Sequence, residues 1–144
     1  MGTQTDSIQS NGIYDNYIRE AKIIHVVDGD TFTAIVELGY CSKIEVDFRL
    51  SGLNTERLET DKGKEAKALF NAFVSNGTKT FIHSEMLIKT PNKMKREKWR
   101  RFLATVYFLD IENIPIGSIR WVNFNERLLN LGLAVPYDGS GIRD

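Results

Sequence analysis

Several kinds of site are excluded by residues that the sequence lacks. The 144 residues include one cysteine, Cys41, and two histidines, His25 and His83, which lie far apart along the chain. One cysteine excludes an intramolecular disulfide, and three residues so spaced do not form a zinc ligand set. No apolar run approaches the roughly 20 residues of a membrane-spanning helix. We therefore expect a cytoplasmic protein that makes no membrane contact and whose histidines have structural roles.

A net charge is also absent, because 19 lysines and arginines balance 19 aspartates and glutamates. Attraction to a polyanion must then come from a local patch. Residues 89–101 form such a patch, with Glu97 as their one acid. Trp99 within it is a candidate to stack on a base, with packing in the protein as the alternative. The cations of the patch, which we expect to contact nucleic-acid phosphates, are Lys89, Lys93, Lys95, Arg96, Lys98, Arg100 and Arg101. Taken alone, such a run is more often a solvated surface.

The hydrophobic pattern divides the chain into a polar N-terminal extension, residues 1–20, and a single domain, residues 21–144. The extension has neither the basic start nor the apolar run of a secretory signal, and we expect it to be flexible. Asp28-Gly29-Asp30 predicts a hairpin, because glycine accepts the positive φ of a tight turn. Apolar and β-branched residues predict strands at 21–27, 31–37, 44–50, 79–88 and 102–109.

Two segments have the apolar spacing of helices. Residues 64–75 carry an apolar stripe, with Asp61 as the expected N-cap and Gly77 as the expected stop. A capping box at Asn123 begins a second helix, which runs through Leu131. The order of three strands, a helix, two strands and a helix predicts an α+β fold that is mainly β. It matches a five-stranded Greek-key barrel of the OB type, a fold that often binds oligonucleotides.

Two charged residues stand at the ends of predicted strands. Asp30 follows the glycine of the hairpin, and Arg49 ends the third strand immediately before the loop at 51–57. Together they predict a site for a cation and an anion. The simpler alternatives are that Asp30 only completes a turn, and that Arg49 only pairs with a neighbouring acid such as Asp47.

Six short motifs in a fixed order give the chain a family resemblance. It resembles the staphylococcal nuclease domains, or thermonuclease-like proteins, and its last motif is especially similar to phage-encoded members. Each motif is weak singly, but their order is specific, and they cover nearly the whole predicted domain. The motifs are residues 27–31, 48–55, 63–67, 98–104, 125–128 and 132–139.

The resemblance implies a calcium-dependent phosphodiesterase that acts on DNA or RNA. It places Asp30 on the calcium ion and assigns Arg49 and Arg101 to the scissile phosphate, where cations neutralise developing charge. The carbonyl of Thr55 would be a further calcium ligand. Tyr137 would stack on a base in the nucleotide pocket, with simple packing as the alternative.

The loop after the third strand departs from the family pattern at its two acidic positions. Asn54 stands where the family has a calcium-binding aspartate, so calcium binding is expected to be weak or absent. Arg57 stands where the family has the glutamate that activates water. A guanidinium has no acceptor and keeps its proton in a protein, so Arg57 cannot be a general base. In a loop one residue shorter, Glu56 would take that position instead.

Three hypotheses follow from these residues. The leading one is a monomeric, nuclease-like domain that binds DNA or RNA, preferentially single-stranded, with a weakened or inactive phosphodiesterase site. The second is an active calcium-dependent nuclease in which Asp30, Asn54 and Thr55 hold the metal and Glu56 activates water. The third is a protein interaction module on a degenerate nuclease fold, which the absence of net charge favours.

Overall fold

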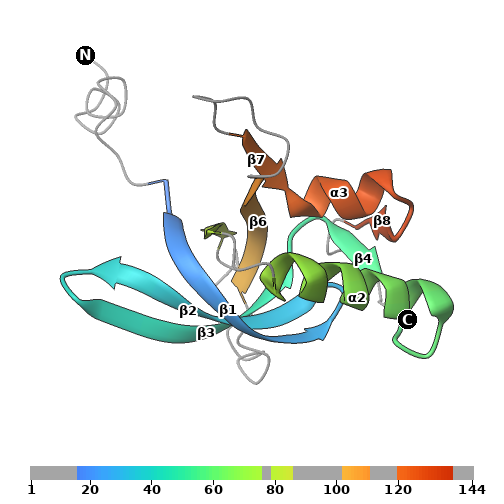
Figure 1. The fold of residues 1–144 in the computed structure, drawn as a ribbon, viewed down its shortest axis with the longest axis horizontal. Helices are drawn as coiled ribbons and strands as arrows, with labels where there is room; N and C mark the ends of the chain where they lie inside the picture. Colours follow the sequence, from blue (N-terminus) through green and yellow to red (C-terminus); the bar gives the residue numbers. More distant parts are fainter. Residues whose placement is uncertain (1–15, 76–78, 86–101, 111–119, 138–144) are drawn as a thin grey trace, which may run out of the picture.

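A computed structural model describes residues 16–75, 79–85, 102–110 and 120–137 of the chain (Figure 1). Two helices lie among eight strands in the described residues. In chain order the elements are β1 (Ile18–Asp28), β2 (Thr31–Gly39), β3 (Ser42–Leu50), β4 (Leu53–Thr55), α2 (Asp61–Ser75), β5 (Thr80–Glu85), β6 (Phe102–Asp110), β7 (Arg120–Asn123), α3 (Phe124–Asn130) and β8 (Ala134–Pro136). All five predicted strands and both predicted helices have counterparts among the described residues, and β1 begins at Ile18, three residues before the expected domain boundary. Residues 1–15 of the predicted extension and residues 86–88 of the strand predicted at 79–88 lie outside the described residues.

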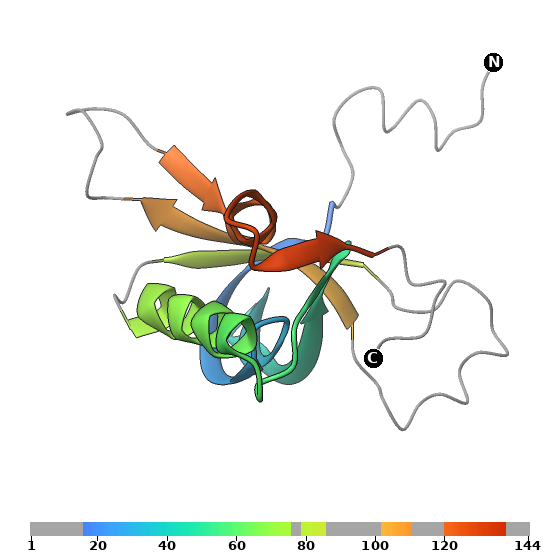
Figure 2. The same ribbon diagram turned by 90° about the vertical axis from the view of Figure 1, so that its right-hand side faces the viewer.

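Five of the strands close into a barrel, which confirms the predicted OB-type fold. Strands β1, β2 and β3 form an antiparallel meander, and β5 pairs antiparallel with both β1 and β6. A parallel pairing of Phe48–Leu50 with Phe102–Ala104 joins β3 to β6 and closes the ring. The later half of β6 pairs instead with β7, so β7 extends the sheet beyond the barrel (Figure 2).

The β2–β3 hairpin projects past the rest of the barrel (Figure 1). As a result, only some of the alternating apolar residues predicted for β3 are buried. Phe48 and Leu50 are in the core, whereas Ile44, on the same face nearer the tip, is 47% exposed. At the tip, Tyr40 and Cys41 both have positive φ angles, which closes the turn, and the Tyr40 side chain is fully exposed.

The core is rich in phenylalanine and is completed by α2. Phe70 of α2 is fully buried, with its ring centroid 5.3 Å from that of Phe32 and 4.5 Å from that of Phe124. Gly63, Ala66 and Phe70 form the buried stripe of the helix, at the helical spacing that the sequence predicts. Because α2 carries part of the core, the loop that leads into it is held against the barrel.

The helix starts are capped by side chains, one of them not the residue that we predicted. The N-cap of α2 is Thr60 and not Asp61, because the Thr60 hydroxyl accepts a hydrogen bond from the Gly63 amide at 3.0 Å. Asp61 is the first helical residue, where an acid suits the helix dipole. Asn123 caps α3 as predicted, with its side chain accepting from the Glu126 amide at 3.1 Å. Gly77, the expected stop of α2, lies outside the described residues.

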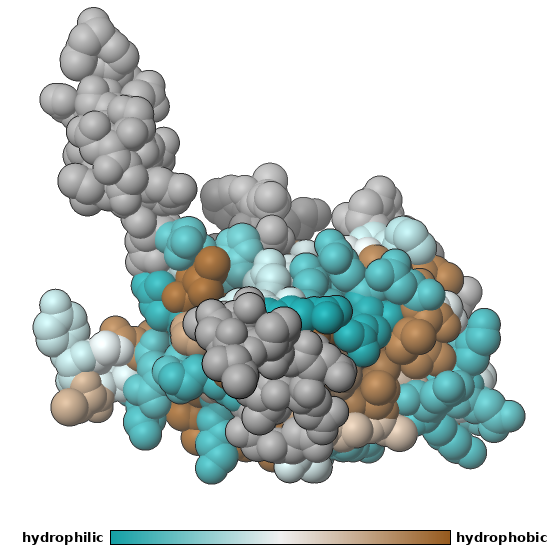
Figure 3. Space-filling model, turned by 45° about the horizontal axis from the view of Figure 1, so that its top comes forward, coloured by the Kyte–Doolittle hydropathy of each residue, from teal (hydrophilic) through white to brown (hydrophobic). Residues whose placement is uncertain are grey.

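On the face that Figure 3 shows, polar side chains cover much of the described surface, with separate apolar patches between them. In the part of the chain that the structure describes, no helix is long and apolar enough to cross a membrane.

Candidate functional site

Asp30 lies in the two-residue turn between β1 and β2 and is completely buried. Both of its carboxylate oxygens accept hydrogen bonds, Oδ1 from the Thr31 hydroxyl and Oδ2 from the Thr55 amide, each at 3.0 Å. Its main-chain carbonyl accepts from the Leu50 amide at 2.8 Å. These bonds offset the cost of burying a carboxylate. Asp30 therefore ties the hairpin turn to the end of β3 and to β4.

Arg49 brings a cation to this buried carboxylate from the end of β3. Its Nη2 atom lies 3.8 Å from Asp30 Oδ2 and donates to the Leu53 carbonyl at 3.4 Å. The side chain is only 12% exposed. Asp47, the acid suggested as a partner by the sequence, instead accepts a hydrogen bond from the Thr33 hydroxyl at 2.8 Å. The structure thus brings together Asp30 and Arg49, the pair predicted from the sequence.

Gly29 allows this arrangement for a reason other than the one we predicted. Its φ angle is not in the left-handed region. A Cβ at this position would lie 2.7 Å from the Ala66 Cβ and 2.9 Å from the Thr55 Cγ2, far inside normal contact. Glycine is needed here because α2 and β4 approach the turn closely. That approach places the Asp30 carboxylate within reach of the Thr55 amide.

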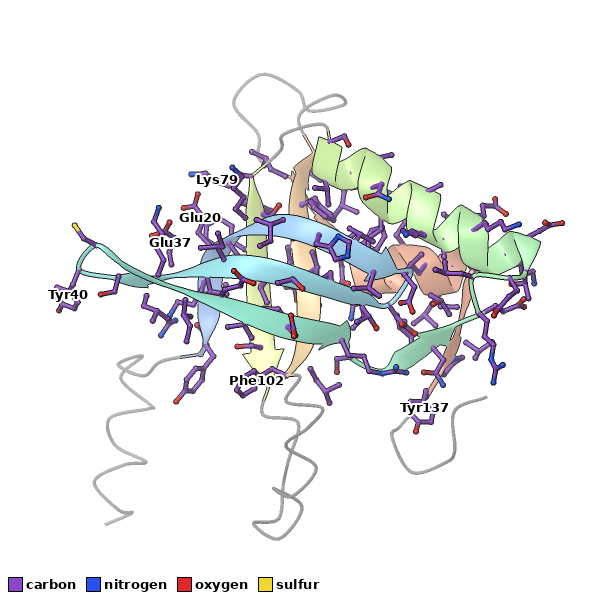
Figure 4. The ribbon with its side chains drawn as sticks, turned by 90° about the horizontal axis from the view of Figure 1, so that it is seen from below. Glu20, Glu37, Tyr40, Lys79, Phe102 and Tyr137 are labelled. Atoms are coloured by element: carbon purple, nitrogen blue, oxygen red, sulfur yellow. The ribbon has the colours of Figure 1, made fainter. Side chains whose placement is uncertain are left out.

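Tyr137 joins the same site through a second, two-stranded sheet. Strands β4 and β8 pair antiparallel, with Leu53 opposite Pro136, and the Tyr137 amide then donates to the Gly52 carbonyl at 2.9 Å. The Arg49 guanidinium carbon lies 5.6 Å from the centroid of the Tyr137 ring, a cation–π distance. We call the end of the barrel where Asp30, Arg49, Thr55 and Tyr137 lie the barrel mouth; Figure 4 labels Tyr137 there.

Asn54 presents an unsatisfied polar atom in β4. Its side-chain oxygen is buried and has no hydrogen-bond partner among the described residues. An unpaired buried acceptor costs about 1–3 kcal/mol. Such an atom next to Thr55, whose amide binds Asp30, is consistent with a site that is completed by a ligand or by water.

The donor set at the barrel mouth does not fit a calcium ion well. Calcium takes about 6–8 oxygen ligands and depends on carboxylate charge. Of the three ligands that the family resemblance implies, one is a carboxylate, on Asp30, and two are neutral, the amide oxygen of Asn54 and the carbonyl of Thr55. The Asp30 charge is already met by Arg49 and by two hydrogen bonds. Among the residues that the structure describes, no three histidine, cysteine or acidic side chains are grouped for a metal.

Glu56 and Arg57, the two residues proposed for the water-activating position, are both exposed and lie between β4 and α2. The Arg57 carbonyl accepts from the Thr60 amide at 3.0 Å and from the Thr60 hydroxyl at 2.8 Å. The loop backbone is therefore fixed by the N-cap of α2, while both side chains have access to solvent.

Gly63 is the contact point between this loop and α2. A Cβ there would lie 1.9 Å from the Arg57 carbonyl oxygen and 2.8 Å from that of Glu56. We predict that Gly63→Ala lowers the free energy of unfolding by about 1–3 kcal/mol, as overpacking does, although alanine is the better helix former. Urea unfolding followed by circular dichroism would measure the loss. Lys64→Ala, at the neighbouring exposed position, is the control, and equal stability of both variants would contradict the prediction.

The remaining predicted site residues lie outside the described residues. They are Arg101, the proposed second phosphate ligand, and Lys93, Lys95, Arg96, Lys98, Trp99 and Arg100 of the cationic segment. Phe102, the residue after Arg101 in the chain, pairs with Phe48, the residue before Arg49.

Comparison with known proteins adds no family assignment to this geometry. None of the protein-family models compared with the sequence matches it, and no curated protein matches it either.

Proposed function

We propose that this domain binds nucleic acid through the barrel mouth and cleaves it weakly or not at all. The observation that carries the proposal is the placement of Arg49, which the buried Asp30 orients at 3.8 Å and which lies over the Tyr137 ring. A guanidinium held by a buried acid loses little conformational freedom when it binds a phosphate. An arginine oriented beside a tyrosine ring offers a phosphate contact and a stacking surface together.

Three further features support nucleic acid as the ligand. The closed OB-type barrel is a common oligonucleotide-binding fold. The chain enters β6 from residues 89–101, which carry seven cations and one acid. The six ordered motifs resemble the staphylococcal nuclease domains, whose substrates are DNA and RNA.

Weak cleavage follows from the chemistry of the loop after β3. Arg57 cannot accept a proton, and loss of a general base typically costs about 10²–10⁴-fold in rate. The poor fit of the mouth to calcium acts in the same direction. The competing reading, an active nuclease, needs the exposed Glu56 to activate water in place of Arg57.

Removal of Arg49 tests the binding half of the proposal. We expect Arg49→Ala to weaken the binding of a single-stranded oligonucleotide about tenfold or more, because a charge-assisted hydrogen bond contributes roughly 1.5–3 kcal/mol. The slope of log affinity against log salt should fall by about 1. Fluorescence anisotropy across a salt series measures both quantities, and Arg49→Lys should recover part of the affinity because it keeps the charge.

Arg127→Ala is the matched control, since Arg127 also lies over an aromatic ring, that of Phe73, at 5.7 Å, but comes from α3. An affinity that changes neither with salt concentration nor with Arg49→Ala or Arg127→Ala would contradict the proposal. It would favour the protein interaction module. Affinity should be the same in calcium and in chelator. Cleavage at the rate of a working nuclease in calcium, lost in Glu56→Gln, would establish the competing reading.

A further inference from the structure

The outward face of β6 differs from an ordinary solvated strand surface. Ala104, Val106 and Phe108 point into the core and are buried. The alternate residues point outward and are only partly exposed: Leu103, Thr105, Tyr107 and Leu109. The strand therefore carries apolar and aromatic side chains on both of its faces.

Aromatic residues of the neighbouring strands flank this outward face. Phe81 of β5 pairs with Tyr107, and Trp121 of β7 pairs with Leu109. The Phe81 and Trp121 rings meet across β6, with centroids 5.1 Å apart and planes at 89°. Trp121 remains 39% exposed. Three aromatic rings from three strands thus occupy one part of the sheet surface, which we call the aromatic track.

The aromatic track is continuous with the barrel mouth. Leu103 is the register partner of Arg49 in the parallel pairing of β6 with β3. Arg49 lies between the buried Phe48 and Leu50, and the neighbours of Leu103 also face the core, so the two residues share the outward face. From Leu103 to Leu109 the strand spans roughly 20 Å at about 3.3 Å per residue. Figure 4 shows Phe102, at the start of β6, on the same side of the barrel as Tyr137, and Lys79 at the opposite end.

Charges near the far end of the track favour a polyanion over an acidic or purely apolar partner. Lys22 of β1 and Lys79, the residue before β5, are exposed there, next to the pair Ala21 and Thr80. Glu20 lies 3.8 Å from the Lys79 ammonium and offsets part of that charge. At the near end stands Arg49, and the seven cations of residues 89–101 lead directly into β6.

We propose that a single strand of nucleic acid, anchored by a phosphate at Arg49, continues along β6 and stacks bases on Tyr107 and Trp121. This inference rests on the proposed function and adds a second contact region to it. Aromatic side chains of this kind bind bases with little sequence preference. Each base stacked on such a ring raises the affinity about tenfold. Short oligonucleotides reach only the mouth, whereas longer ones also reach Trp121.

Affinity as a function of oligonucleotide length tests the track. An oligothymidylate of about 3 nucleotides, below the site sizes of OB folds, and one of about 10 nucleotides, within them, would be titrated by fluorescence anisotropy. We expect the longer one to bind the unaltered protein at least tenfold more tightly. Trp121→Ala should lower the affinity for the longer oligonucleotide about tenfold and leave the affinity for the shorter one unchanged. Trp121→Phe should restore most of the lost affinity. Arg49→Ala should weaken both.

Tyr40→Ala is the matched control, because Tyr40 is a fully exposed aromatic residue at the tip of the β2–β3 hairpin. If neither Trp121→Ala nor Trp121→Phe changes the affinity for the longer oligonucleotide while Arg49→Ala lowers it, binding along the aromatic track is refuted and binding at the barrel mouth is retained. If Arg49→Ala weakens neither length, the proposed function itself is wrong. Thermal unfolding confirms that each variant is folded.

Discussion

Replacing Asn54 with aspartate and Arg57 with glutamate is expected to raise calcium-dependent cleavage of single-stranded DNA at least about 100-fold, the lower range for a general base. The double substitution restores both acidic positions of the pattern that this loop resembles. Arg57 is exposed, so glutamate enters without repacking. Asn54 already has a buried side-chain oxygen without a partner among the described residues, and aspartate adds the missing charge there. Initial rates with calcium and with chelator measure the gain.

A readout independent of cleavage separates the two substitutions. Asn54→Asp adds a carboxylate to β4 at the position that the family resemblance assigns to calcium, so calcium should raise the melting temperature of this variant more than that of the unaltered protein. Arg57→Gln is the control for the loop, because it removes the cation without supplying a strong base. A double variant that binds calcium but gains no cleavage would refute the assignment of Arg57 to the water-activating position. A gain that disappears with Glu56→Gln would transfer the role to Glu56.

The elements that the sequence predicts correctly are those whose apolar period extends over several residues. Apolar residues alternate along the nine residues of β2 and recur at helical spacing over about four turns of α2. Each pattern is long enough to be recognised despite single exceptions. Strands β4 and β8 have three residues each and β7 has four, too few for a period to be detected. Their pairing is set by the tertiary fold, which brings Leu53 opposite Pro136.

The candidate site shows the same division between local and tertiary information. Asp30 and Arg49 were predicted to lie together, because each follows a recognisable local signal at the end of a strand. The stacking of Arg49 on Tyr137 depends on the β4–β8 pairing and had no such signal. Gly29 was predicted as a turn residue, but the space that α2 leaves, and not its φ angle, requires glycine. Sequence patterns therefore identify candidate residues, whereas contacts between elements distant in the chain determine what those residues do.

Asn125 is a structural residue whose role the sequence did not reveal. It is the second residue of α3 and is buried. Its side-chain oxygen accepts from the Val106 amide at 3.1 Å, and its side-chain nitrogen donates to the Ser51 and Ala104 carbonyls at 3.0 Å each. The Ser51 amide also donates to the Ala104 carbonyl at 2.8 Å. One amide side chain thus joins β6 to the end of β3, where the barrel closes beside Arg49.

Asn125→Ala is expected to lower the free energy of unfolding by about 3 kcal/mol or more, because each buried backbone group left without its partner costs roughly 1–3 kcal/mol. Asn125→Asp should be at least as damaging, since a carboxylate cannot donate to the Ser51 and Ala104 carbonyls and its charge would be buried. Asn130→Ala, at the exposed end of α3, is the matched control and should change stability by less than about 0.5 kcal/mol. Urea unfolding followed by circular dichroism distinguishes them. If Asn125→Ala were as stable as the control, the barrel would close without this bridge, and the β3–β6 pairing alone would hold Arg49 in place.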